Sequence, residues 1–143
     1  MKRRGKVLVV EDDPQWSARL KEYLEENGFR VTTKNTKEQA LEILGKENFH
    51  FATIDLKLDE TNLSDNFEGW EVLKKIFDVG ANNLMEIMVL TGFEADENKK
   101  KALREYGATF FMPKGEFDKK EFIETIIRVV EMRNVRFKDD YRD

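Results

Sequence analysis

Four short apolar segments of this chain each end in a side chain that can do chemistry. In chain order these ends carry Glu11 with Asp12, then Asp55, Thr91 and Lys114. Clustered carboxylates with no Cys or His beside them form a hard-oxygen site, which suits Mg²⁺ or Mn²⁺. A carboxylate next to such an ion can also attack a phosphoryl group. If the four ends meet at one place, the sequence predicts a metal-assisted phosphoryl-transfer site.

Side-chain chemistry gives each of these residues a predicted role. Asp55 is the candidate nucleophile, accepting a phosphoryl group as an acyl phosphate. Glu11 and Asp12 are candidate metal ligands, with Glu11 acting through water. Phosphoryl transfer depends mainly on positioning and charge neutralisation. Lys114 is therefore expected to pair with one phosphoryl oxygen, and Thr91 to donate a hydrogen bond to another.

Composition excludes several other kinds of site. Among the 143 residues there is no Cys and a single His, which rules out disulfides, thiolate metal sites and a histidine-rich metal cage. Twenty-nine acidic residues against 25 basic ones give a net charge of −4. We therefore expect no direct nucleic-acid partner and no membrane partner. The N-terminal apolar run VLVV is too short for a signal peptide, so a cytoplasmic protein is expected.

Alternating apolar and helical patterns must bring the reactive residues together. The predicted strands cover 6–10, 29–33, 51–55, 86–91 and 109–112. The predicted helices cover 14–28, 36–47, 69–80, 95–107 and 117–134. Strict β-α alternation predicts an α/β fold, a doubly wound (βα)5 parallel sheet with helices on both faces. Ligands of such sheets bind outside the carboxyl ends of the strands, where the reactive residues stand.

The motifs at these positions resemble those of response-regulator receiver domains in two-component signalling, of the chemotaxis-regulator type. The matching stretches are VLVVEDDP, TIDLKL, GWEVLKKI, VLTG and GATFFMPK, in this order and on the corresponding elements. The resemblance covers roughly residues 5–133. It implies the flavodoxin-like strand order 2-1-3-4-5. We expect a receiver domain over 1–134, followed by a charged C-terminal tail at 135–143 that is either frayed or an extension of the last helix.

The resemblance carries the family's roles onto matching positions. It implies that Asp55 is phosphorylated and that Lys114 pairs with the phosphate. Thr91 and Phe111 become the switch pair. The implied metal ligands are Glu11, Asp12, Asp55 and the backbone carbonyl of Lys57.

In function, the resemblance implies a Mg²⁺-dependent (or Mn²⁺-dependent) signalling switch rather than an enzyme with its own substrate. Asp55 would receive its phosphoryl group from a partner histidine kinase or histidine phosphotransfer protein. The switch would then signal to a downstream protein target, as a monomer or a phosphorylation-dependent dimer. Only 135–143 follows the receiver, so a stand-alone receiver is expected. The alternatives are a phosphorylation-independent adaptor, and a haloacid-dehalogenase-like phosphohydrolase, whose second Asp is replaced here by Lys57.

Gly115 and the loop 56–68 depart from the family pattern. Gly115 follows Lys114 where the family usually has a proline after a cis bond, so we expect a trans bond and a different or looser path for the lysine. The loop is several residues longer than usual and adds acidic groups. We interpret it as a solvated insertion, with screening of partners or outer-shell metal binding as the alternative. The added acidic residues are Asp59, Glu60, Asp65 and Glu68.

Three aromatic or basic positions bear on switching and phosphoryl lifetime. Phe111 lacks the hydroxyl of the more common tyrosine, so a switch here would act by packing alone. Lys57 and Phe93 lie two residues beyond Asp55 and Thr91, on the path of the hydrolytic water in this family. A long cation and a bulky ring there predict a comparatively long-lived phosphoryl group.

Other residues that could suggest chemistry receive simpler predictions. His50 is expected to be an exposed loop residue. Trp16 and Trp70 are expected to be packing residues, with Trp16 close enough to the acids for its fluorescence to report metal binding.

Overall fold

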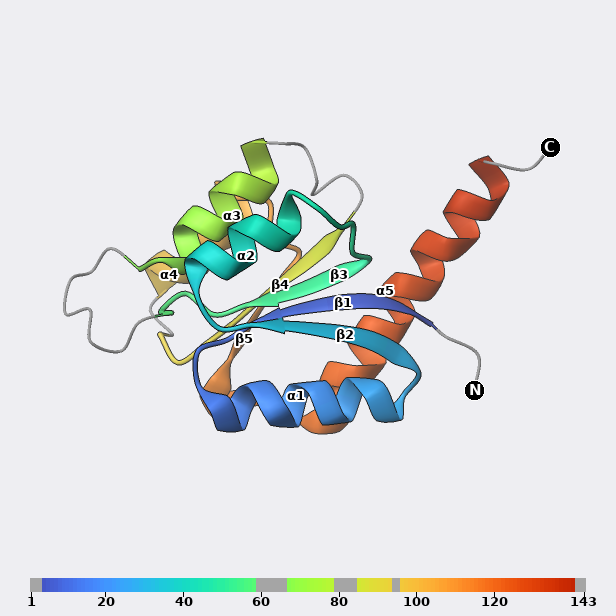
Figure 1. The fold of residues 1–143 in the computed structure, drawn as a ribbon, viewed down its shortest axis with the longest axis horizontal. Coiled ribbons are helices and arrows are strands. Elements are labelled where there is room, and N and C mark those ends of the chain that lie inside the picture. Colours follow the sequence, from blue (N-terminus) through green and yellow to red (C-terminus); the bar gives the residue numbers. More distant parts are fainter. Residues whose placement is uncertain (1–3, 59–66, 79–84, 94–95, 141–143) are drawn as a thin grey trace.

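The computed structural model describes residues 4–58, 67–78, 85–93 and 96–140, and it contains one parallel sheet of five strands in the order β2-β1-β3-β4-β5 (Figure 1). The strands are β1 (Gly5–Val10), β2 (Phe29–Lys34), β3 (Phe51–Ile54), β4 (Glu86–Thr91) and β5 (Phe110–Pro113). The helices are α1 (Pro14–Glu26), α2 (Lys37–Leu44), α3 (Gly69–Asp78), α4 (Asp96–Arg104) and α5 (Lys119–Asp140). The predicted fold class and strand order are confirmed.

Both faces of the sheet are covered by helices, with α2, α3 and α4 on one side and α1 and α5 on the other (Figure 1). Successive residues of a strand point to opposite faces. In β1, Leu8 and Val10 accordingly join the core under α2 to α4, while Val7 and Val9 join the core under α1 and α5. Burial on both faces explains why the strands read as continuous apolar runs.

Local signals fix where the first two helices begin and end. Asp13 caps α1, its side chain accepting hydrogen bonds from the backbone N–H groups of Gln15 and Trp16. Gly28 follows the helix with φ at 89°, a conformation that favours glycine. At α2, the Thr36 hydroxyl accepts a hydrogen bond from the N–H of Gln39, as the capping pattern predicts.

The last helix runs beyond residue 134, one of the two outcomes expected for the tail, whereas His50 differs from its expectation. α5 continues to Asp140 because no Gly or Pro interrupts the chain beyond residue 134. The division into a receiver and a tail stays a prediction. His50 is half-buried rather than exposed, and its Nδ1 accepts a hydrogen bond from the Lys6 N–H at 3.0 Å. The expectation of an exposed loop residue was therefore wrong.

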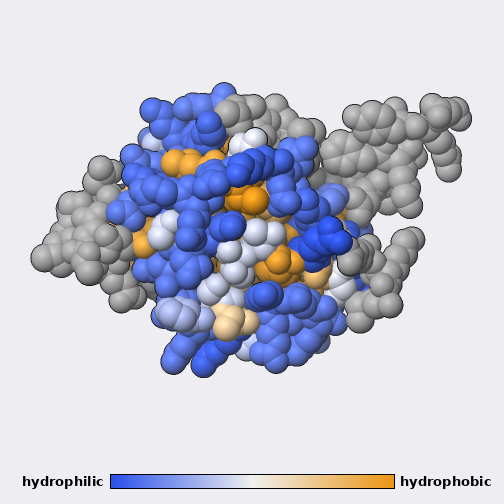
Figure 2. Space-filling model, viewed as in Figure 1, coloured by the Kyte–Doolittle hydropathy of each residue, from blue (hydrophilic) through white to orange (hydrophobic). Residues whose placement is uncertain are grey.

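Hydrophilic side chains cover most of the described surface on the face seen in Figure 2, where apolar atoms occur in small separate areas. Among the described residues, none of the helices combines the length and apolar character that crossing a membrane requires. The described part of this face thus offers no large apolar patch.

Candidate phosphoryl-transfer site

The reactive side chains meet because neighbouring parallel strands end at the same edge of the sheet. In the ladder, Val10 of β1 pairs with Ile54 of β3, so the residues that follow them, Glu11 and Asp55, emerge side by side. At the same carboxyl edge, on the two strands beyond β3, Thr91 of β4 pairs with Pro113 of β5, the residue before Lys114. The register of the sheet therefore brings together residues that the sequence could only assign to the ends of separate strands.

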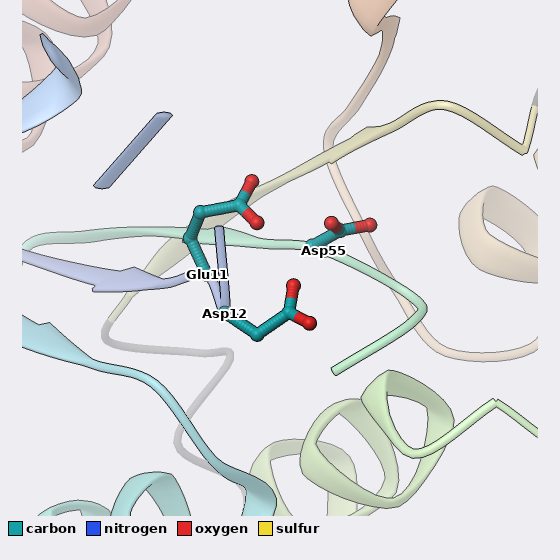
Figure 3. Close-up of side chains that lie close together, drawn as sticks. All are labelled: Glu11, Asp12 and Asp55. Carbon is teal, nitrogen blue, oxygen red and sulfur yellow. The ribbon is translucent and has the colours of Figure 1, made fainter. Parts of the chain in front are cut away.

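Three carboxylates surround one small space at this edge (Figure 3). Each of Glu11, Asp12 and Asp55 offers an oxygen atom, and these oxygens all lie within 4.8 Å of one another. Glu11 is 2% exposed and Asp55 6% exposed, while Asp12 is half-buried. Like charges held this closely repel one another unless a cation shares the space. An all-oxygen donor set of this kind fits Mg²⁺ or Mn²⁺.

Lys114 supplies a positive charge to the same cluster. Its Nζ lies 2.7 Å from a carboxylate oxygen of Glu11 and 3.0 Å from one of Asp55. The other Glu11 oxygen accepts a hydrogen bond from the Asp13 N–H, and the second Asp55 oxygen accepts one from the Lys57 N–H. Both buried carboxylates are thus fixed in orientation by hydrogen bonds to each of their oxygens.

Crowded charge shifts the ionisation of two groups in the site. Burial, followed by the charge of Asp55, raises the pKa of Glu11 to about 8, and the Lys114 ammonium only partly opposes this. Burial alone would lower the pKa of Lys114, but the charges of Asp55 and Glu11 outweigh it and raise this pKa above its usual value. A second cation would favour the ionised form of Glu11.

The predicted switch residues stand on β4 and β5, the two strands beyond β3 in the sheet. Thr91 is fully buried at the end of β4, and its hydroxyl accepts a hydrogen bond from the Phe93 N–H at 3.2 Å. The hydroxyl hydrogen remains to be donated in another direction. Phe111 pairs with Val89 across the β4–β5 ladder and is partly buried against the core under α2 to α4. A phenyl ring there can act only through packing.

Of the long loop, only its two ends are described. Asp59, Glu60 and Asp65 lie outside the described residues, so their predicted roles stay predictions. At the far end Gly69 packs so tightly on the strand end that a Cβ there would lie 2.3 Å from the Asp55 carbonyl oxygen and 2.5 Å from the Leu56 Cα. The first turn of α3 is therefore pressed directly against the backbone of Asp55 and Leu56.

An aromatic group stands on one side of the site, which we call the Phe93 flank (Lys57, Phe67 and Phe93). The rings of Phe67 and Phe93 lie 4.4 Å apart between centroids, and the Lys57 ammonium lies 5.5 Å from the Phe93 ring. Sequence reasoning named Lys57 and Phe93 but missed Phe67. No local signal marks Phe67, because its contact crosses from the loop before α3 to the residues after β4.

On the other side stands the Trp16 flank (Trp16, Lys114 and Phe117). The Lys114 ammonium lies 5.0 Å from the Trp16 ring, and Trp16 meets Phe117 edge to face at 5.2 Å. Trp16 was expected to be a packing residue, and it does pack against the core under α1 and α5. Its contact with Lys114 was not anticipated. The bond from Lys114 to Gly115 is trans, as expected, since no described peptide bond is cis.

Comparison with known proteins agrees with this geometry. The sequence profile of the response regulator receiver domain matches residues 7–127, most of the chain. The chain belongs to this family. The receiver is also similar to the two-component response regulator PprB of Pseudomonas aeruginosa, at 27% identity over 111 residues. That match covers 76% of this chain but 38% of PprB, so the receiver spans well under half the length of this relative.

Solved structures give the same assignment. A CheY-like receiver domain protein from Methanospirillum hungatei is 25% identical, with a TM-score of 0.76, and the match covers 95% of this receiver and 99% of that chain. The response regulator TrrA of Thermotoga maritima, solved in complex with Mg²⁺–BeF, is 25% identical with a TM-score of 0.70. That match covers 90% of this receiver and 99% of TrrA. The chain is thus a receiver domain of a two-component response regulator, from a family of signalling switches.

Proposed function

We propose that this receiver accepts a phosphoryl group on Asp55 in a Mg²⁺-dependent reaction and changes conformation to signal to a partner. The observation that carries the proposal is the meeting of three carboxylate oxygens within 4.8 Å with an ammonium 3.0 Å from Asp55. This arrangement offers a nucleophile, a place for a divalent ion and a fixed positive charge. All three are needed to transfer a phosphoryl group between anions.

The transfer step follows from the positions of the residues. One carboxylate oxygen of Asp55 forms a bond to phosphorus while the bond from phosphorus to the donor breaks, and the donor's leaving atom keeps the electron pair. With a phosphohistidine donor, the leaving atom is an imidazole nitrogen. Lys114 is close enough to follow the charge as it moves onto the phosphoryl oxygens. Thr91 has a hydroxyl hydrogen to donate as the acyl phosphate forms.

The proposed ligands of the divalent ion are Glu11, Asp12, Asp55 and the carbonyl of Lys57, with Glu11 acting through water. When bound, the ion neutralises phosphoryl oxygens and draws donor and acceptor together. The complex of TrrA with Mg²⁺–BeF supports this choice of metal. Mn²⁺ has the same preference for oxygen and would serve as a substitute.

The readout of the acyl phosphate is assigned to Thr91 and Phe111. Movement of the Thr91 hydroxyl toward the phosphoryl group would free space beside β5, and Phe111, already partly buried, would turn into it. Such a change shifts the balance between two conformations of the surface near α4. The donor is proposed to be a histidine kinase or a histidine phosphotransfer protein, and the recipient a downstream protein, with activity in the cytoplasm.

The second candidate function is a phosphorylation-independent adaptor. The observation that favours it is the Phe93 flank, where the paired rings of Phe67 and Phe93 and the Lys57 ammonium form a bulky group beside the strand end that carries Asp55. A phosphohydrolase is less well supported, because Lys57 occupies the position where that mechanism needs a general acid. The three candidate functions differ in whether the chain gains a phosphoryl group on Asp55 and whether it hydrolyses a phosphate ester over many cycles.

The test is incubation of the full chain with acetyl phosphate and Mg²⁺, followed by intact mass spectrometry. The proposed function predicts addition of one phosphoryl group that depends on the metal and is absent in Asp55→Asn. A chain that gains no mass would favour the adaptor. Rapid multiple turnover of a simple phosphate ester would favour the phosphohydrolase.

A further inference from the structure

Lys114 needs a support that survives the reaction. The lysine has a flexible four-carbon stem, and it enters a 3₁₀ turn (Lys114–Glu116) whose second residue is Gly115. Its ion pairs with Glu11 and Asp55 place it in the site before the reaction. Both anions are themselves involved in metal binding or phosphorylation, however. A contact that does not change charge would hold the ammonium in one place while its anionic partners change.

The indole ring of Trp16 provides such a contact. The Lys114 ammonium lies 5.0 Å from the ring centroid, within the distance at which a cation is attracted to an aromatic face. Trp has the strongest such attraction among the aromatic side chains, and it grows when the cation is shielded from water. The Lys114 side chain is 16% exposed, so most of it is shielded. The indole carries no charge that phosphorylation could alter.

The ring itself is held from two directions. Trp16 lies in the first turn of α1, where its backbone N–H donates to the Asp13 carboxylate that caps the helix. Its ring meets Phe117 at an interplanar angle of 87°, and Phe117 packs in turn on the buried Phe122. The Phe117 N–H donates to the Lys114 carbonyl at 3.2 Å. Phe117 thus contacts both the turn that carries Lys114 and the Trp16 ring over which the ammonium lies.

We infer that Trp16 is a positioning residue for phosphoryl transfer, holding the Lys114 ammonium toward the acceptor oxygen of Asp55. The inference rests on the proposed function and adds to it a residue on a different element, α1, to which no role in binding the phosphoryl group or the metal is assigned. Trp16 acts only through Lys114. This dependence distinguishes it from a residue that merely packs.

The test measures the initial rate of Asp55 phosphorylation by acetyl phosphate and Mg²⁺ in the full chain. Trp16→Leu keeps an apolar side chain but removes the aromatic face, and is expected to slow the reaction about fivefold. Trp16→Phe keeps a face and is expected to stay within about twofold of the wild type. Tyr23→Leu is the matched control, because Tyr23 lies on the same helix and stacks on the same Phe117 but carries Lys119 over its ring.

A double-mutant cycle decides between positioning and packing. In a Lys114→Met background, Trp16→Leu is expected to cause no further loss of rate, since the ring has no ammonium left to hold. Thermal melts of all variants separate loss of fold from loss of rate. The inference is overturned if Trp16→Leu keeps the wild-type rate, if Tyr23→Leu loses as much, or if Trp16→Leu is equally harmful without Lys114. A wild-type chain that is never phosphorylated overturns the proposed function, and the inference with it.

Discussion

Each of the two flanks of the site places a lysine ammonium over an aromatic ring, but the surroundings of the two contacts differ. On the Trp16 flank, the lysine over the ring is ion-paired to two buried carboxylates and mostly shielded from water. On the Phe93 flank, Lys57 lies over a ring that is 37% exposed, and this ring is tilted by 43° against that of Phe67. A cation–ring contact is stronger where water is excluded.

This difference separates two tasks. A shielded ammonium that reaches Asp55 can stabilise charge during transfer, whereas a half-exposed one over an exposed ring can mainly occupy space. We therefore expect changes on the Trp16 flank to alter how fast Asp55 gains its phosphoryl group. Changes on the Phe93 flank should alter how long Asp55 keeps its phosphoryl group.

The sharpest test of the comparison exchanges each lysine for methionine. Lys114→Met removes a preorganised donor at the acceptor and is expected to lower the initial rate of phosphorylation about a hundredfold. Lys57→Met removes a half-exposed contact and should change that rate by no more than about threefold. Intact mass spectrometry over a time course measures both. Equal losses in the two variants would contradict the division of tasks.

The next largest effect is expected on stability, from a substitution at Gly69, which follows Phe67 and Glu68 at the start of α3. Gly69→Ala forces a methyl group against the backbone of Asp55 and Leu56 and is expected to lower the free energy of unfolding by about 3 kcal/mol. Gly92→Ala is the matched control, because a Cβ there meets nothing within 4 Å, and it should stay within about 0.5 kcal/mol of the wild type. Urea denaturation measures both. A tolerated Gly69→Ala would mean that α3 can shift away from the strand end.

Much of this molecule could be predicted from sequence because each element carries its own signal. Apolar strands, the Asp13 cap and Gly28 mark where elements lie, and parallel strands must end at one edge. The candidate acids follow from that rule alone. The contacts of Trp16 and Phe67 could not be predicted, since they join elements through side-chain directions that spacing does not fix. The end of α5 stayed open between two outcomes for a different reason, because a charged tail without Gly or Pro fits a helix as well as a frayed end.

Stability and metal affinity are expected to depend on pH through Glu11, whose carboxylate lies 2.7 Å from the Lys114 ammonium of the Trp16 flank. The folded protein raises the pKa of Glu11 to about 8 from a usual value of 4.5, so the folded state binds this proton more tightly than the unfolded state. In the metal-free protein, the resulting stability is complete below the unfolded pKa and is lost as the pH rises through about 8.

Mg²⁺ prefers the ionised carboxylate, so its affinity should rise roughly tenfold between about pH 7 and about pH 8.5. Isothermal titration measures the affinity, and urea midpoints in a chelator measure the stability. Glu11→Gln serves as the control and should flatten both profiles. An unchanged pH dependence in Glu11→Gln would assign the titration to another group.

The smallest effect is expected on the Phe93 flank, in the lifetime of the acyl phosphate. We expect the hydrolytic water to approach the acyl phosphate past Phe93, whose ring is tilted against that of Phe67 and lies 5.5 Å from the Lys57 ammonium. Phe93→Ala and Phe67→Ala should each shorten the lifetime severalfold while leaving the forward rate unchanged. The decay is followed by mass after the donor is removed, with the exposed Phe77→Ala on α3 as control. A wild-type lifetime of seconds would refute the covering role. A slower forward rate in Phe93→Ala would show that the two flanks share one task, because access and transfer would then depend on the same ring.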